Sequence, residues 1–172
     1  MRTTVDQKAF RDAMSRLGAA VNVVTTDGPA GRHGLTASAV CSVTDAPPTL
    51  LVCVRRTATA HEAFRVNGAL CVNILAGRHQ DLSDRFGRPG IPAEQRFAGA
   101  AWTLLATGAP VLTDAAASLD CRIASVAQVG THSVLFCEVV EIVTAAQPEG
   151  LIYFNRLYHP LRSPPSHEEV FA

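Results

Sequence analysis

SLDCRIASVAQV (118–129) and THSVLFCEVVEIV (131–143) are two long runs rich in β-branched and apolar residues, and they abut at Gly130. Runs of this composition on either side of a glycine predict two long antiparallel strands joined by a hairpin turn. The rest of the chain offers few helical segments and no alternation of strands with helices. The sequence therefore predicts a mainly β fold, an antiparallel barrel with a few short helices.

Shorter segments around this hairpin complete the predicted barrel. Strands are expected over 20–26, 35–43, 49–55, 69–75 and 150–155, with turns at 27–34 and 45–48. Helices are expected over 5–17, 57–67 and 78–86. In the first helix, Asp6 is the expected cap and Gly18 the expected stop. Residues 87–97 contain two glycines and two prolines, so a mobile loop with one helical turn is expected there.

Length and charge limit the class of protein. The 172 residues suit a single domain over 1–172, ending in a proline-rich tail over 160–172 that either wraps a partner subunit or frays. Lysine plus arginine and aspartate plus glutamate both count 15, so no nucleic acid or anionic membrane is expected as partner. No window approaches 18 apolar residues, so no membrane span is expected. Lys8 is the only lysine, which excludes a Walker-type phosphate loop.

Five cysteines form an odd set without a Cys-x-x-Cys pair, and each lies in an apolar run. They are Cys41, Cys53, Cys71, Cys121 and Cys137. Free cysteine behaves as a small buried hydrophobe, so we interpret these residues as core thiols in a reducing cytoplasm. A redox-active or nucleophilic cysteine is the alternative. The polar start of the chain lacks the apolar core of a signal peptide, which also favours the cytoplasm.

Generic catalytic and metal motifs are absent. No Gly-x-Gly-x-x-Gly follows a strand, and no Gly-x-Ser-x-Gly elbow occurs. His61-Glu62 begins a zinc-helix pattern, but Arg65 stands where the second histidine is required. The six histidines show no repeated ligand spacing, so no metal site is expected.

Two hydroxyl-bearing segments are candidate binding sites. Alternation in a strand would place Thr36, Ser38, Val40 and Ser42 on one face, where small side chains let a flat ligand approach the backbone. A hydroxyl-rich surface strand explains the same pattern. The second segment, 55–59, combines arginines with threonines before a helix and is typical of a phosphate site. A helix cap at Thr57 explains part of that pattern.

At this point the residues match a known family. The stretch 10–54 resembles the short-chain flavin reductases of two-component monooxygenases, and within them the reductase component of 4-hydroxyphenylacetate 3-monooxygenase. The segments 69–75, 84–86, 130–142 and 150–161 continue the match in order. The resemblance implies a split β-barrel of Greek-key antiparallel type that forms a homodimer. It also implies that FMN or FAD is reduced by NADH or NADPH, and that reduced flavin diffuses to a separate oxygenase acting on an aromatic substrate.

The resemblance further implies binding roles for particular residues. Those along the isoalloxazine ring are Thr36, Ala37, Ser38, Ala39, Val40, Cys41 and Ser42. Those at the ribityl chain and phosphate are Arg55, Thr57 and Thr59, with Arg85 and Phe86 near the phosphate. Those elsewhere around the cleft are Asn73, His132 facing the nicotinamide, and Tyr153, Tyr158 and His159 at its border. A strand-end cap at Asn73, core packing at Phe86 and Tyr153, and a turn histidine at His132 are the alternatives.

No catalytic side chain is expected, because nicotinamide and flavin themselves carry hydride transfer. The protein would hold the two rings in stacking geometry and donate hydrogen bonds where charge develops on the flavin. Two other functions fit the same barrel. One is a non-catalytic FMN-binding electron-transfer protein, and the other an enzyme like pyridoxamine-phosphate oxidase.

Overall fold

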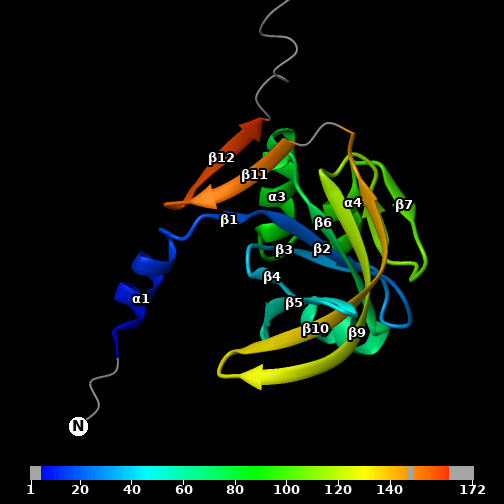
Figure 1. The fold of residues 1–172 in the computed structure, drawn as a ribbon, viewed down its shortest axis with the longest axis horizontal. Helices are drawn as coiled ribbons and strands as arrows, with labels where there is room; N and C mark the ends of the chain where they lie inside the picture. The colour runs from blue at the N-terminus through cyan, green and yellow to red at the C-terminus, as the bar shows by residue number, and fades with distance from the viewer. Residues whose placement is uncertain (1–4, 147–148, 163–172) are drawn as a thin grey trace, which may run out of the picture.

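The computed structural model describes residues 5–146 and 149–162, and its largest sheet has seven antiparallel strands in the order β3-β2-β6-β9-β10-β5-β4 (Figure 1). These strands are β2 Asn22–Thr26, β3 His33–Ala37, β4 Val40–Asp45, β5 Pro48–Arg55, β6 Ala69–Ile74, β9 Ala117–Val129 and β10 His132–Thr144. A second sheet, β1-β11-β12, consists of Ala19–Ala20, Glu149–Phe154 and Leu157–Arg162. A third pairs β7 Trp102–Leu104 with β8 Pro110–Leu112. The mainly β prediction is confirmed.

The long hairpin is present as predicted. β9 and β10 have 13 residues each and turn at Gly130, whose φ of 54° is a left-handed conformation that glycine adopts without a Cβ penalty. Their register shifts between Phe136 and Cys137 and again between Val139 and Glu141. Such irregularities bend a strand and increase its twist. The two strands accordingly bend along their length at the centre of the sheet (Figure 1).

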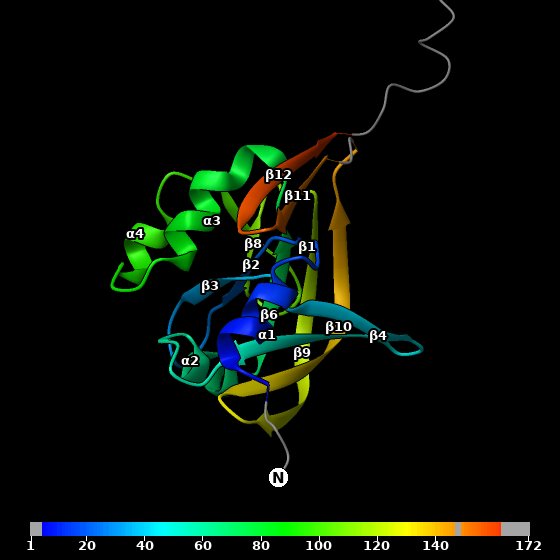
Figure 2. The ribbon, with the colours of Figure 1, turned by 90° about the vertical axis from the view of Figure 1, so that its left-hand side faces the viewer.

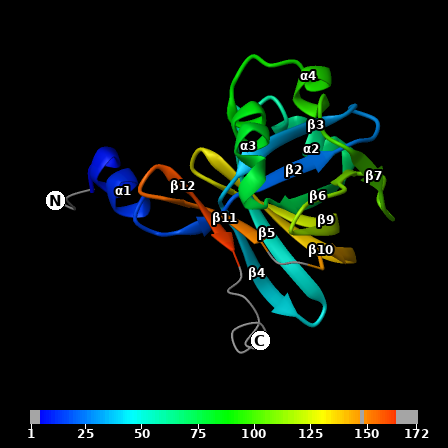
Figure 3. The ribbon, with the colours of Figure 1, turned by 90° about the horizontal axis from the view of Figure 1, so that it is seen from above.

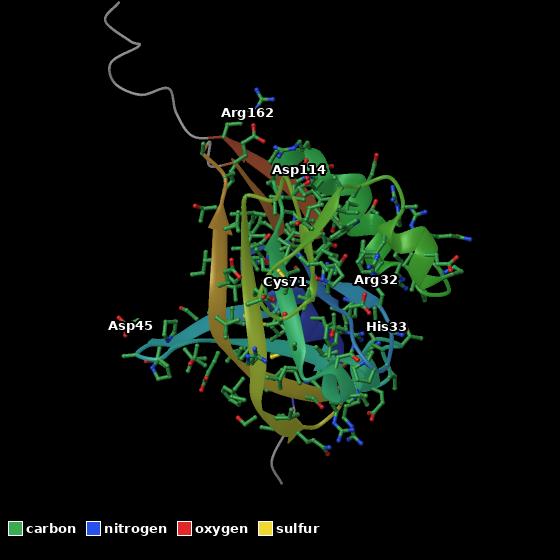
Figure 4. The ribbon with its side chains drawn as sticks, turned by 90° about the vertical axis from the view of Figure 1, so that its right-hand side faces the viewer. Arg32, His33, Asp45, Cys71, Asp114 and Arg162 are labelled. Atoms are coloured by element: carbon green, nitrogen blue, oxygen red, sulfur yellow. The ribbon has the colours of Figure 1, made fainter. Side chains whose placement is uncertain are left out.

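A closed barrel is not shown. β3 and β4 are the two edges of the seven-stranded sheet, and no pairing between them is recorded in the described part of the chain. The single strand predicted over 35–43 is interrupted at Ser38 and Ala39, because β3 pairs with β2 whereas β4 pairs with β5. The chain thus passes from one edge of the sheet to the other at this bend. The β4–β5 hairpin then projects from the body, with Asp45 at its tip (Figures 2 and 4).

The helices are shorter than predicted. They are α1 Gln7–Met14, α2 His61–Asn67, α3 Gln80–Gly87 and α4 Ala93–Phe97, with a 3-10 turn η1 at Gly77–His79. Asp6 caps α1 as expected, since its carboxylate accepts from the Ala9 N–H at 3.1 Å. The helix ends at Met14 with Ser15 as its C-cap, before the predicted stop at Gly18. α2 begins at His61 rather than at Thr57, so the segment 57–60 is a turn.

α1 is amphipathic but buries none of its residues. Phe10 and Met14 are 59 % and 46 % exposed, and Leu17 beyond the helix is 63 % exposed. Seen from above, α1 stands apart from the body of the protein (Figure 3). The apolar periodicity that predicts this helix therefore marks a face without a partner in the single chain.

Three of the five cysteines are core thiols, as predicted. Cys71, Cys121 and Cys137 are 0 % exposed, and Cys71 lies inside the sheet (Figure 4). Burial raises the pKa of the Cys137 thiol to about 12 and raises the pKa of the other two as well. Cys53 is half-buried. Cys41 is exposed on the edge strand β4, so the prediction of a core position is wrong there.

We expect Cys71, Cys121 and Cys137 to resist thiol reagents in the native protein, because both burial and a raised pKa suppress the thiolate. Titration with a disulfide reagent should label these three only after denaturant is added. Mass spectrometry of the labelled peptides identifies the sites. Fast native labelling of any of the three would contradict the burial described above.

Candidate functional site

Two neighbouring cavities lie along β3 and form the candidate site. The first, here the tyrosine cavity, has about 180 Å³ and is lined by Val21, Thr36, Ser38, Ser83, Tyr153 and Tyr158. The second, here the arginine cavity, has about 360 Å³. Its lining includes Arg55, Thr57, Thr59, Phe86, Arg88 and Arg96. A Cβ built on Gly87, which lines the arginine cavity, would lie 3.7 Å from Thr36, so the two cavities adjoin there.

The tyrosine cavity is polar but uncharged where the side chains meet it. Tyr158 and Tyr153 come from adjacent strands β12 and β11, and their rings pack edge to face with centroids 5.4 Å apart. The Tyr158 hydroxyl and Ser83 Oγ are 2.8 Å apart, and the same hydroxyl donates to Asp84 Oδ1 at 2.9 Å. Burial, followed by the nearby Asp84 carboxylate, raises the pKa of Tyr158, so its phenol stays protonated at neutral pH. These groups suit a flat polar ligand.

The floor of this cavity is β3. Thr36 Oγ1 donates to the Ser83 carbonyl at 2.5 Å, which joins the strand to α3. Gly34 brings the same two elements together, because a Cβ there would lie 2.7 Å from the Phe86 ring and 3.0 Å from the Val24 carbonyl. The glycine thus permits α3 to lie directly on β3, beside both cavities.

The arginine cavity lies at the end of β5. Arg55 is its last residue, and the exposed Thr57 and Thr59 follow in the turn before α2. On the opposite side, the segment after α3 contributes Arg88, and α4 contributes Arg96. Within residues 5–146 and 149–162, none of these three arginines forms an ion pair. Guanidinium groups and hydroxyls in this arrangement suit a phosphate.

His132 lies next to the arginine cavity without lining it. It pairs with Arg55 in the β5–β10 register, and the Arg56 N–H donates to the Thr131 carbonyl at 3.0 Å. His132 Nδ1 and Thr131 Oγ1 are 2.9 Å apart. The imidazole is therefore positioned at the cationic end of the site, half-buried and available to a second ligand.

Part of the predicted ring-binding strand points elsewhere. Thr36 and Ser38 reach the tyrosine cavity, whereas Ala37 belongs to the core and Val40 packs against it. The remaining residues of this set are exposed, and they line neither cavity: Ala39, Cys41 and Ser42. The bend between β3 and β4 is the physical reason, since it ends the alternation on which the common face depended.

The structure brings Asn73 to neither cavity. Its side chain is 0 % exposed and saturated with hydrogen bonds. Nδ2 donates to the Val23 carbonyl and Thr25 Oγ1, and Oδ1 accepts from the Leu112 N–H and from Ser118 Oγ. This amide joins β2, β6, β8 and β9 in the interior. It is a structural residue, and we leave it out of the candidate site.

Three other residues predicted to bind flavin do not present their side chains to the cavities as predicted. Phe86 lines the arginine cavity, but its 1 % exposed ring packs against Phe97 with centroids 5.0 Å apart. Arg85 donates to the Ala98 carbonyl and lies outside both cavities. His159 pairs with Ile152 and bonds the Phe154 carbonyl at 3.2 Å, on the face of the hairpin opposite Tyr158. Core packing accordingly accounts for the Phe86 ring.

Sequence reasoning missed Ser83, Arg88 and Arg96. Arg88 and Arg96 lie in the stretch 87–97, which was predicted to be a mobile loop, and no local motif there points to a binding role. Nothing in the local sequence marks Ser83, whose position depends on the contact of α3 with β3 and β12.

A larger hollow of about 900 Å³ lies between α1 and the turn joining β11 to β12, and it shares Ser38 and Tyr153 with the tyrosine cavity. The guanidinium and hydroxyl groups of the 55–59 segment line the arginine cavity and not this hollow, so we place the candidate site in the two smaller cavities instead. Within the described ranges, no group of three or more His, Cys, Asp or Glu side chains could hold a metal ion. Nor is any helix there sufficiently long and apolar to span a membrane.

A model of the flavin reductase like domain matches residues 14–162. The chain belongs to this family. It is 58 % identical over 156 residues to the FMN reductase (NADH) RutF of Variovorax paradoxus. The alignment covers 91 % of this chain and 86 % of that relative.

Solved structures agree with this membership. A Haemophilus somnus protein described as a flavin reductase has 48 % identity and a TM-score of 0.88, over 91 % of this chain and all of that one. The flavin reductase component of a bacterial two-component tryptophan halogenase has 27 % identity and a TM-score of 0.86, over 92 % and 100 %. The family resemblance drawn from the sequence is thus confirmed. A specific relation to 4-hydroxyphenylacetate monooxygenase is not shown.

Proposed function

We propose that this protein is an NADH-dependent FMN reductase, an oxidoreductase that takes flavin as a substrate. The observation that carries the proposal is the pair of adjoining cavities along β3, uncharged at the tyrosine end and cationic at the arginine end. FMN has the matching shape and charge, with a flat heterocycle at one end and a phosphate at the other. The names of the curated relatives support FMN and NADH as the pair of substrates.

The residues present fit this ligand. The isoalloxazine ring would rest on Thr36 of β3 and on Ser38 just after it, with the two tyrosines at its border. The phosphate would be bound by Arg55, Thr57 and Thr59, which present guanidinium and hydroxyl donors. FAD contains the same isoalloxazine ring and first phosphate as FMN, so the same site would also accept FAD.

With both substrates bound, the chemistry would be hydride transfer from NADH to the flavin ring, which the two molecules carry out themselves. The chain's own part is to align the rings and to exclude water from their contact. Backbone groups of β3 would hydrogen-bond the heterocycle, and the hydroxyl oxygens of Tyr158 and Ser83 would accept from it, because the Tyr158 proton is donated to Asp84. No side chain is required as general acid or base.

Reduced flavin is proposed to diffuse to a separate oxygenase. The halogenase reductase described above belongs to a two-component system of this kind. The sequence resemblance favours an aromatic monooxygenase of 4-hydroxyphenylacetate type as the partner, whereas the curated relatives are named FMN reductase (NADH) RutF. Coupled turnover with a purified 4-hydroxyphenylacetate monooxygenase, compared with the oxygenase that the RutF relatives serve, distinguishes the two partners. Free thiols at all five cysteines are consistent with the proposed cytoplasmic location.

A homodimer is proposed because large apolar side chains stay exposed in the single chain. They occur on the outer parts of β9 and β10, on α1 and just after α1, and they include Val129, Ile142, Val143, Phe10 and Leu17. A second copy of the chain would cover these apolar side chains in a symmetric interface. Sedimentation should give about twice the chain mass of 18.2 kDa. A monomer at micromolar concentration would contradict this proposal.

The function is tested by following NADH oxidation in flavin-stripped protein. We expect no oxidation until FMN is added, and then a rate that saturates with FMN. A non-catalytic electron-transfer protein would retain FMN and oxidise no NADH. An enzyme like pyridoxamine-phosphate oxidase would oxidise its amine substrate instead. Rapid NADH oxidation without added flavin would refute the proposal.

His132→Ala should raise the Michaelis constant for NADH by a few-fold to about ten-fold, because one hydrogen bond to the dinucleotide is lost. The Michaelis constant for FMN should change little, since His132 lies beside the arginine cavity rather than in it. Both constants and the melting temperature are measured on the same variant. A lower melting temperature with an unchanged NADH constant would make His132 a structural turn residue.

A further inference from the structure

Arg96 is a buried arginine whose recorded hydrogen bonds all go to backbone carbonyls. It is 8 % exposed on α4. Its acceptors are the carbonyl oxygens of Ile91 at 3.0 Å, Arg88 at 2.7 Å, Gly34 at 3.5 Å, and Phe86. The planar guanidinium therefore ties both ends of the segment 86–91 to each other and to β3.

Apart from the buried Phe86 ring at its start, this segment has few other contacts that hold it. In the described part of the chain, one recorded backbone hydrogen bond fixes the start of the segment. The Arg88 N–H donates to the Asp84 carbonyl at 3.0 Å. Its middle residues, 87–90, are exposed, and Gly90 has a φ of 77°. The same four residues line the arginine cavity. The position of this wall thus depends on Arg96.

The charges around the cavity point to an anion. Arg55, Arg88 and Arg96 all line it, and across the described ranges no carboxylate pairs with any of them. Burial lowers the pKa of Arg96, which reflects the cost of keeping a cation away from water. A buried cation without a paired carboxylate is destabilising by itself, and an anion bound nearby offsets that cost.

We propose that Arg96 is a positioning residue that sets the preference for phosphorylated flavin. It holds the segment 86–91 against the arginine cavity, so that Arg88 and the segment's backbone close over the flavin phosphate opposite Arg55. The proposal rests on the FMN reductase function proposed above. It adds that the fork geometry of the guanidinium, in addition to its charge, is required.

The test compares FMN with riboflavin, which lacks the phosphate, in Arg96→Lys and in the wild type. Lysine keeps the charge but lacks the planar fork that reaches several carbonyls at once. We expect the ratio of kcat/KM for FMN to that for riboflavin to fall by about ten-fold in Arg96→Lys, mainly through the FMN Michaelis constant. A general loss of stability would affect both flavins equally. An unchanged ratio would overturn the proposal.

Arg32→Gln is the matched control. Arg32, labelled in Figure 4, pairs with Asp27 at 3.0 Å and lies over the Phe97 ring of α4, and its recorded side-chain hydrogen bond goes to Asp27 and not to the segment 86–91. The ratio of kcat/KM for FMN to that for riboflavin should be the same in Arg32→Gln as in the wild type. Hydrogen exchange of the wild-type protein provides a test that needs no variant: FMN should protect the amides of 86–91 more than riboflavin does. Equal protection would also overturn the proposal, whereas failure of the wild type to reduce either flavin would refute the proposed function itself.

Discussion

Arg55→Gln is expected to raise the Michaelis constant for FMN by about ten-fold while leaving that for riboflavin almost unchanged. Arg55 ends β5 at the arginine cavity and has no carboxylate partner within the described ranges, so its guanidinium is available to a phosphate. Hydrogen bonds to charged groups are worth about 1.5–3 kcal/mol, and exposure of this side chain places the expected loss at the lower end. Steady-state kinetics with both flavins measures the effect.

Arg65→Gln provides the control for this variant. Arg65 is an exposed arginine on α2 that pairs with Glu62 at 2.8 Å and lines neither cavity. Its removal should change neither Michaelis constant. If Arg55→Gln and Arg65→Gln behave alike, or if riboflavin is affected as strongly as FMN, then the arginine cavity does not bind the flavin phosphate.

Asn73→Ala is expected to destabilise the protein by about 2–4 kcal/mol, a drop in melting temperature of roughly 10 °C. The side chain is fully buried, and its removal leaves several buried groups without partners, among them the Leu112 N–H and the Ser118 hydroxyl. The Michaelis constant for FMN, measured well below the melting temperature, should stay near the wild-type value. Thermal unfolding combined with kinetics separates stability from binding.

An exposed amide on β9, Gln128, provides the comparison, since no side-chain hydrogen bond is recorded for it. Gln128→Ala should leave the melting temperature within about 2 °C of the wild type. A stable Asn73→Ala variant with a strongly raised FMN constant would return Asn73 to the binding site, as the sequence resemblance had implied.

The elements of the fold were largely predictable, because they depend on local pattern. The β9–β10 hairpin follows from two long β-branched runs around Gly130, and α1 from its cap at Asp6 and its apolar spacing. The break between β3 and β4 was not predictable. Each of the two strands pairs with a near neighbour in sequence, β3 with β2 and β4 with β5. That these two hairpins end up at opposite edges of one sheet depends on β6, β9 and β10, which lie between them and come later in the chain.

The candidate site was predictable in part for the same reason. Arg55, Thr57 and Thr59 are neighbours in sequence, so their proximity needed no tertiary information. Asn73 lies in ALCVNIL (69–75), a strand buried on both faces, and such a run gives no indication of which side chains face a cavity.

Residues that reach the site from other elements were harder to predict. Arg88 and Arg96 enter it only because the segment after α3 folds back over the end of β5. That return is a tertiary event without a local motif.

The central claim, that FMN binds along β3 between the tyrosine and arginine cavities, is tested most directly by a crystal structure of the protein with FMN. The account predicts the isoalloxazine ring over Thr36 and the phosphate within hydrogen-bond distance of Arg55 and Thr57, with Arg96 still bonded to the segment 86–91. An FMN molecule bound instead in the hollow beside α1, or with its phosphate away from the arginines, would contradict it.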